Sequence, residues 1–361
     1  MTGYEPVEGI YRWLLYTPLH LLWAGTEAVY VFFVLSGLVL ARSVIRGHPF
    51  DWRAYFPSRL ARLYLPVLGA VGFAALTILI VPRAGAESSW VMFHPASYSL
   101  QTAFQDVTLV GGTSNVVTPL WSLQWEVLFS LLLPIFIVIA RGRWLAATVS
   151  ACLALTAVGY STGILFVAFM PMFAIGVAIA YQWDRIERTS TVISTRRGGW
   201  LAWPIALLAA LLMICSYWLL YPIVGDSAPI LVWTRPLVVS GAVIVVIAAA
   251  VWPPLRRLLA WRPFHWLGLI SFSLYLVHDP IIVATAFLLD GAKWTVIVGI
   301  AVSVIFAVAF YFAVERPSHH LSRRISRRAA RRPNSKEVEK KAIKALLGRE
   351  DDSGRLGSRD D

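Results

Sequence analysis

Charged residues are scarce in this chain: Asp, Glu, Lys and Arg together make up 14% of its 361 residues, whereas soluble domains hold about 25%. Hydrophobic residues account for 58%, and the mean hydropathy is +0.67. So few charges cannot cover a surface that faces water. The composition therefore excludes an ordinary soluble domain and indicates an integral membrane protein.

Cysteine is rarer still, and Cys152 and Cys215 both fall inside apolar runs. Their position argues against a disulfide framework and against a cysteine metal site. The sequence also lacks a P-loop, a dinucleotide-binding glycine pattern, a G-x-S-x-G elbow and an H-E-x-x-H zinc motif in a suitable setting. We therefore expect no bound cofactor and no metal.

A net charge of +12 is unevenly placed, because nearly half of the 32 Lys and Arg residues follow Val314. A basic segment beside a membrane fits anionic lipid headgroups on the cytoplasmic face better than it fits a nucleic acid. We therefore expect the lipid bilayer, and no nucleic acid, among the partners.

Long apolar runs are what the chain does have. Nine lie near the ~20 residues that a spanning helix needs, at about 22–42, 62–81, 118–140, 144–160, 163–182, 200–221, 230–252, 266–289 and 294–314. They predict an all-α membrane protein, a polytopic bundle of about nine transmembrane helices. Residues 1–21 form a segment before this 22–314 domain, and residues 315–361 form a basic tail, disordered or a short helix on the membrane surface.

Basic residues are concentrated in every second connection between these runs. The connections after the first, third, fifth and seventh runs are rich in arginine, and the others hold almost none. Since basic loops stay in the cytoplasm, this pattern predicts a cell-membrane protein with a cytoplasmic C-terminus and an outer N-terminus. Residues 1–21 carry no signal-peptide pattern, so an outer N-terminus would be explained by a further helix upstream.

The eighth run holds the most unusual residue for its depth. His278 lies 12 residues past Trp266, roughly 18 Å from the inner end of its helix and near the bilayer midplane. An ionisable residue at that depth indicates a functional site, although a neutral histidine bonded to a neighbouring helix is the alternative. Asp279 points about 100° further around the helix, so we expect it to contact a different element.

A second candidate lies at the start of the third run, "TPLWSLQWEVLFS". Trp121 and Ser122 belong to it, and Glu126 lies about 12 Å below the outer surface, where a carboxylate would need a raised pKa or a cationic partner. Either would suit a proton acceptor. An aromatic belt with one glutamate in a wet crevice is the alternative.

The remaining candidates are polar residues near the ends of runs. Arg59 and Arg62 share a helix face at the expected inner mouth of the second run, where they suit a phosphate-bearing ligand or, equally, lipid headgroups. Ser36 is a weaker candidate, and it precedes Gly37, which allows close helix packing. Histidines outside the runs are expected to be solvated, namely His20, His94, His319 and His320.

Taken in order, "AVYVFFVLSGLVL", "SRLARLYLP", "TPLWSLQWEVLFS", "SFSLYLVHDPI" and "VERP" resemble the motifs of acyltransferase family 3 over residues 24–317. The resemblance implies a ten-helix membrane domain, a cytoplasmic acyl-CoA co-substrate and an acceptor on the outer side. It implies donor binding by Arg59 and Arg62 and catalysis by Glu126 and His278, supported by Trp121, Ser122 and Ser36. The expected depths place Arg59 and Arg62 at the inner mouth of the bundle, His278 near the midplane and Glu126 in the outer half.

One departure concerns the family's first helix, which carries a catalytic histidine and has no counterpart here. His20 is a poor substitute because it lies in the segment that normally follows that helix. The chain is therefore expected either to start further upstream or to be a truncated relative.

We expect an acyltransferase that moves an acyl group, acetyl in the first instance, from acyl-CoA to a hydroxyl of a sugar-containing acceptor. An exopolysaccharide, a cell-wall glycan or a glycolipid would serve, by direct transfer or through an acyl-enzyme. Two alternatives remain, a proton-coupled transporter or flippase and an inactive membrane scaffold. Against a transporter, the sequence shows no inverted repeat or matched pair of broken helices.

Overall fold

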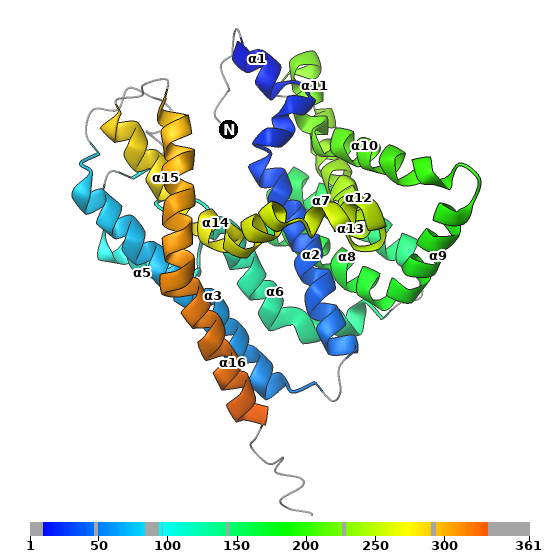
Figure 1. Ribbon diagram of the computed structural model, residues 1–361, viewed down its shortest axis with the longest axis horizontal. Coiled ribbons are helices and arrows are strands. Elements are labelled where there is room, and N and C mark those ends of the chain that lie inside the picture. The colour runs from blue at the N-terminus through cyan, green and yellow to red at the C-terminus, as the bar shows by residue number, and fades with distance from the viewer. Residues whose placement is uncertain are drawn as a thin grey trace, which may run out of the picture.

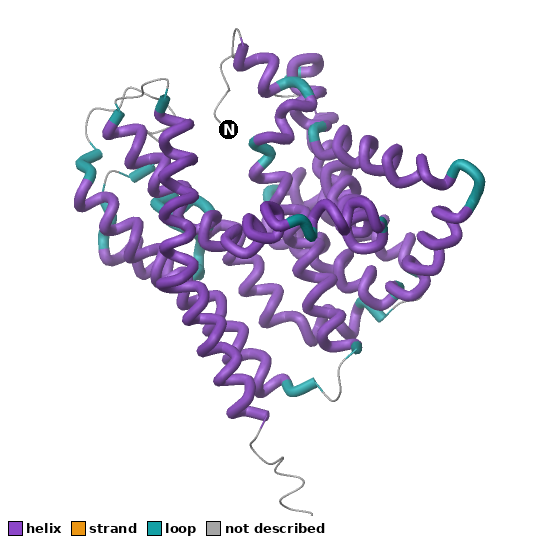
Figure 2. The backbone as a smooth tube through the Cα atoms, in the orientation of Figure 1, coloured by secondary structure: helices purple, strands orange, loops and turns teal. Residues whose placement is uncertain are grey.

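Helices dominate the described part of the computed structural model (Figures 1 and 2). The structure describes residues 10–46, 50–83, 94–95, 97–141, 144–225, 229–289 and 294–330, and no β-strand occurs among them. The predicted all-α class is confirmed.

The helices are given in chain order. The first part of the chain forms α1 (Ile10–Leu15), η1 (Pro18–Leu22), α2 (Gly25–Ile45), α3 (Trp52–Ile80), α5 (Leu100–Thr108), α6 (Leu120–Ile139) and α7 (Leu145–Thr162). The middle part forms α8 (Leu165–Tyr181), α9 (Trp183–Thr195), η2 (Gly199–Leu201), α10 (Ala202–Ile214), α11 (Ser216–Val224) and η3 (Pro229–Trp233). The last part forms α12 (Thr234–Val251), α13 (Pro253–Leu259), α14 (Arg262–Leu288), α15 (Thr295–Phe310), η4 (Tyr311–Glu315) and α16 (Arg316–Ala330).

Seven helices in the described part of the chain are long and apolar enough to cross a membrane, and the number rises to nine if each of two bent pairs is one span. The bends lie between α8 and α9, at 74°, and between α10 and α11, at 49°. The predicted run 200–221 is therefore two helices that meet at Cys215, and the run 163–182 ends at a turn into a polar helix. This range agrees with the predicted polytopic bundle.

The last span continues beyond the predicted boundary at residue 314. A single π-helical turn, η4, joins α15 to α16, and α16 packs along α3. The Ser322 Oγ of α16 donates a hydrogen bond to the Ser58 carbonyl of α3 at 2.7 Å. The expected tail is thus helical from Glu315 to Ala330, and the residues after Ala330 lie outside the described part.

Two glycines allow α2 and α8 to cross closely. A Cβ on Gly37 would collide with the backbone of Phe173, and a Cβ on Gly176 would collide with the backbone of Val34 and Leu38. The predicted packing role of the glycine after Ser36 is confirmed.

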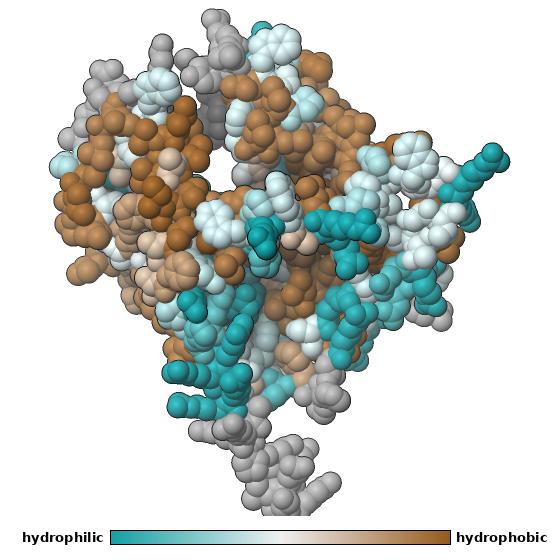
Figure 3. Space-filling model, in the orientation of Figure 1, coloured by the Kyte–Doolittle hydropathy of each residue, from teal (hydrophilic) through white to brown (hydrophobic). Residues whose placement is uncertain are grey.

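Two apolar cores surround the site. One joins α2, α7, α8 and α12 to α6, and the other joins α3, α14 and α15 to the opposite side of α6. Helix α6 lies between the two cores. A cavity remains where α2, α6 and α14 meet. In Figure 3, hydrophilic residues gather over α16 at the lower end of the molecule, whereas much of the upper surface is hydrophobic.

Candidate functional site

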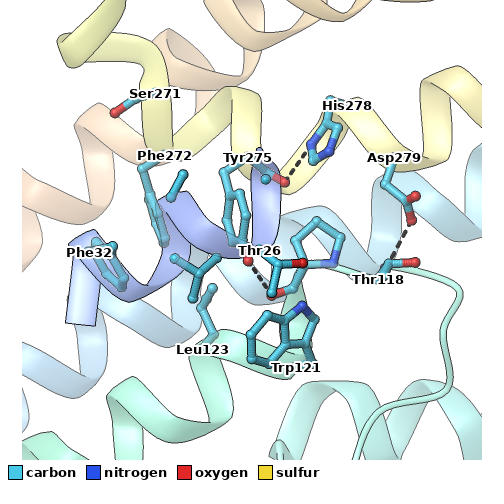
Figure 4. Close-up of a pocket in the computed structure, with 14 residues that line it drawn as sticks. Thr26, Phe32, Thr118, Trp121, Leu123, Ser271, Phe272, Tyr275, His278 and Asp279 are labelled. Atoms are coloured by element: carbon cyan, nitrogen blue, oxygen red, sulfur yellow. Dashed lines mark hydrogen bonds between the residues drawn. The ribbon is translucent and has the colours of Figure 1, made fainter. Parts of the chain in front are cut away.

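A cavity of about 530 Å³ lies where α2, α6 and α14 meet (Figure 4). Its α2 wall is mostly small and apolar, whereas aromatic and polar side chains line the other two walls. Its lining consists of Gly25, Thr26, Ala28, Val29, Phe32, Thr118, Pro119, Trp121, Leu123, Ser271, Phe272, Tyr275, His278 and Asp279. A mostly apolar cavity with a few convergent polar groups is the usual form of a small-molecule site.

His278 reaches this cavity from α14 with a defined hydrogen-bond arrangement. Its Nδ1 lies 2.9 Å from the Tyr275 carbonyl oxygen and 3.1 Å from the Leu274 carbonyl oxygen. Because a carbonyl only accepts, Nδ1 carries the proton in the neutral ring, and Nε2 keeps its lone pair. The ring can therefore accept a proton at Nε2.

A second cavity of about 580 Å³ lies between α14 and α15, and His278, Tyr275 and Ser271 line both cavities. The rest of the second lining is largely aliphatic, including Leu274 and Ile300. His278 thus lies between a cavity with polar groups and an apolar one.

Tyr275 is a site residue that the sequence analysis missed. Its hydroxyl lies 2.6 Å from the Ser122 Oγ and 3.1 Å from the Pro119 carbonyl oxygen, to which Ser122 also donates at 3.1 Å. Tyr275 precedes His278 by three residues, so the two share a helix face. That spacing is a signal in the sequence that could have revealed it.

Asp279 connects α14 to the beginning of α6. Its Oδ2 accepts the backbone N–H of Thr118 at 2.9 Å, and its Oδ1 lies 3.3 Å from the His94 Nε2. The expectation that Asp279 contacts a different element from His278 is confirmed. The expectation of a solvated His94 is wrong, because the side chain of His94 is only 6% exposed.

Glu126 is ion-paired rather than free. Its Oε1 lies 2.5 Å from the Arg59 Nη2, and the Arg59 Nε donates to the Ser130 Oγ at 3.3 Å. The side chains of Arg59 and Glu126 are 14% and 5% exposed, so the pair lies inside the bundle. Glu126 therefore has the cationic partner that a buried carboxylate needs.

This pairing corrects the expected order of depths. The second apolar run was placed from residue 62, but α3 already begins at Trp52, where Asp51 caps its first turn. Arg59 then lies roughly 10 Å along the helix instead of at its mouth. Arg59 and Glu126 consequently lie at one level and are not separated by most of the membrane.

Arg62 lies near Arg59, Glu126, Glu315 and Arg323, and its side chain remains exposed. Glu315 is buried and accepts a hydrogen bond from the Ser273 Oγ at 2.5 Å. Arg62 therefore lies among charged groups from α3, α6 and α16.

The remaining predicted residues divide between cavity and core. Trp121 lines the cavity and contacts Phe169 of α8 at 5.4 Å between ring centroids. Ser122 is fully buried against Tyr275. Ser36 is buried in α2 and does not line either cavity.

His20 forms a separate buried group with Glu27 and Trp218. Its ring stacks on Trp218 at 4.4 Å, its Nε2 lies 4.0 Å from the Glu27 Oε2, and Glu27 also accepts from the Trp218 Nε1 at 3.1 Å. Burial lowers the pKa of His20, which Glu27 partly opposes. The expectation of a solvated His20 is therefore wrong, although His20 does not line the cavity.

Comparison with known proteins assigns the chain to a family. A family model described as an acyltransferase domain matches residues 8–314. The chain belongs to acyltransferase family 3. The family membership that the resemblance of its motifs implied is confirmed.

Two curated relatives are similar over 83% of the chain. YrhL of Bacillus subtilis (strain 168), which carries the provisional name of a peptidoglycan O-acetyltransferase, is 27% identical. OatA of Listeria monocytogenes serovar 1/2a (strain ATCC BAA-679 / EGD-e), named as a peptidoglycan O-acetyltransferase, is 24% identical. The chain spans about half of each relative, 51% and 52% respectively. No solved structure matches the chain.

Proposed function

We propose that this protein transfers an acetyl group from acetyl-CoA to a hydroxyl of a cell-wall glycan, with the cavity between α2, α6 and α14 as the transfer site. The family assignment supports acyl transfer, and the names of both relatives support an acetyl group and a peptidoglycan acceptor. The observation that carries the proposal is His278, whose Nδ1 faces two backbone carbonyls and whose Nε2 is left as a proton acceptor in the cavity.

In the proposed reaction, Nε2 of His278 accepts the proton of the glycan hydroxyl. The hydroxyl oxygen attacks the thioester carbonyl carbon, the ester C–O bond forms, and the C–S bond breaks. The leaving thiolate takes the proton back from the imidazolium, so the histidine ends neutral.

Tyr275 is proposed to polarise the thioester carbonyl. Tyr275 lies about one helical turn from His278. Its hydroxyl is already hydrogen-bonded to the Ser122 hydroxyl and to the Pro119 carbonyl. A donor held in place by its neighbours stabilises the oxyanion at little reorganisation cost. Trp121, Phe32 and Phe272 present apolar faces to the same cavity, which suit the apolar face of a sugar ring.

Glu126 and Arg59 are proposed to act as a structural pair beneath this site, and Arg62 to meet the phosphates of the donor. This assignment replaces the catalytic role expected for Glu126, since its carboxylate already binds Arg59. The C-terminus and Arg62 are proposed to face the cytoplasm, as the arginine-rich connections indicate. The donor would then approach from inside and the glycan from outside.

The function is tested with the purified full chain in liposomes, radiolabelled acetyl-CoA and soluble peptidoglycan fragments. We expect label in the fragments as an ester that mild alkali releases. Label that appears as free acetate at the same rate with and without fragments would contradict a glycan acceptor. No consumption of acetyl-CoA by folded protein would contradict the proposed donor.

A further inference from the structure

Helix α16 packs along α3, and two contacts define their relative direction. At one level, the Ser322 Oγ of α16 donates to the Ser58 carbonyl of α3 at 2.7 Å. At a second level, a Cβ on Gly69 of α3 would lie 2.8 Å from the Cγ1 of Val314. Higher numbers on α3 thus meet lower numbers on α16, so the two helices run antiparallel.

This register brings Arg62 to α16. Arg62 lies four residues from Ser58, about 6 Å along α3, and His319 lies three residues from Ser322, about 4.5 Å along α16 in the matching direction. Arg323 follows Ser322 directly. Electrostatic contact of Arg62 with Arg323, and of His319 with both arginines, agrees with this placement.

The charges of this group do not balance. The Glu126 carboxylate binds Arg59, and the Glu315 carboxylate binds Ser273 and lies 3.6 Å from the His319 Nε2. Within the described part of the chain, no ion pair joins an acid to Arg62 or to Arg323. Two neighbouring guanidinium groups repel each other unless an anion lies between them.

Both arginines are exposed and can therefore reach a ligand. Arg62 also lies near Glu126 and Glu315, which are 3% and 4% exposed. Arg62 is thus exposed and also interacts electrostatically with two buried carboxylates. A planar guanidinium fork matches phosphate oxygens well.

We propose that α16 supplies half of a phosphate-binding site, in which Arg323 and Arg62 grip a phosphate of the nucleotide portion of the acyl donor. The inference rests on the proposed acyl-CoA donor and adds a residue of α16 that lies beyond the last sequence motif. It also replaces the expected Arg59 and Arg62 pair, because Arg59 is held by Glu126. The continuation of the last span into α16 brings Arg323 within about 7.5 Å of the level of Arg62 along the paired helices, and two long arginine side chains can converge across that offset.

The test measures the affinity of the purified full chain for CoA in nanodiscs of phosphatidylcholine, which carry no net lipid charge. Arg323→Gln and Arg62→Gln should each weaken CoA binding about 10-fold, as the loss of one charge-assisted phosphate contact does. The double variant should lose less than the product of the two, because the residues share one phosphate. Arg323→Lys should bind CoA better than Arg323→Gln.

Arg324→Gln is the matched control, since Arg324 is an exposed arginine on the same helix that points about 100° away from Arg323. It should leave CoA affinity unchanged. Equal CoA affinity of Arg323→Gln, Arg324→Gln and the unaltered chain would overturn the inference. Such a result together with lost binding of anionic phospholipid would assign Arg323 to headgroups instead.

The outcomes also separate this inference from the proposed function. If the unaltered chain fails to bind CoA, the proposed donor is wrong. If the unaltered chain binds CoA and Arg323→Gln binds it equally well, the donor stands and only the role of α16 is overturned. Unfolding temperatures of all variants are measured alongside, so that a loss of affinity is assigned only to folded protein.

Discussion

Neighbouring residues on α14 make different contacts. His278 and Tyr275 line both cavities, whereas Asp279 lines only the first and also accepts the backbone N–H of Thr118, just before α6. A helix separates adjacent residues by about 100°, so a sequence of His-Asp does not make a catalytic dyad. The dyad-like contact of Asp279 is with His94, which lies far away in the chain.

Removal of the Tyr275 hydroxyl tests its proposed role at the carbonyl. Tyr275→Phe should lower kcat about 100-fold with little change in KM, because one preorganised oxyanion donor contributes on the order of 10²–10³ to the rate. Steady-state kinetics of acetyl transfer give both constants. Ser271→Ala is the control in the same cavity, since the Ser271 Oγ is bound within its own helix, 2.9 Å from the Gly268 carbonyl. Equal kcat values for the two variants would leave Tyr275 a packing residue.

Glu126→Gln tests whether Glu126 supports Arg59 or accepts a proton. The substitution leaves Arg59 as an unpaired buried charge and should destabilise the protein by roughly 3 kcal/mol. The double variant Arg59→Gln, Glu126→Gln should recover part of this loss, measured as the unfolding temperature in detergent. A single variant with the unfolding temperature of the unaltered protein but no activity would instead favour the proton-acceptor role.

At the scale of helices, apolar periodicity and motif order could predict the spans and two residues of the cavity lining, Trp121 and His278, but not which helices are neighbours. The run of hydrophobic residues hid the true start of α3 at Trp52, because Arg53, Arg59 and Arg62 interrupt the apolar pattern without interrupting the helix. It also could not show that Arg59 and Glu126 meet, since periodicity says nothing about which helices are neighbours. His278 was found because depth alone makes a histidine unusual.

The crossing of α2 and α8 depends on the absence of a side chain at Gly176. Gly176→Ala should destabilise the protein by about 1–3 kcal/mol, because the added methyl group meets the backbone of α2 and must force the helices apart. Gly72→Ala is the matched control, since nothing lies within 4 Å of a Cβ on Gly72 and alanine favours a helix. Gly72→Ala should be neutral or stabilising. Equal unfolding temperatures for the two variants would contradict the close crossing.

At the scale of the whole molecule, the account depends on which end of the bundle faces the cytoplasm. Arginine-rich connections predict a cytoplasmic C-terminus. Cysteines introduced at Ser97 and Ser335 should therefore differ in their reactivity with a membrane-impermeant maleimide added to intact cells. Ser97→Cys should react and Ser335→Cys should not. The two native cysteines are buried, so their background labelling should be low. Reaction at Ser335→Cys in intact cells would reverse the proposed approach of donor and acceptor.

The central claim is that the cavity between α2, α6 and α14 is the acyl-transfer site and that His278 is its base. The most direct measurement is kcat of His278→Ala for acetyl transfer to peptidoglycan fragments, beside His265→Ala, an exposed histidine on the same helix. The account predicts a loss of about 10²–10⁴ for His278→Ala, the range of general-base catalysis, and an unchanged kcat for His265→Ala, with both proteins folded. Equal kcat values for the two variants would contradict it.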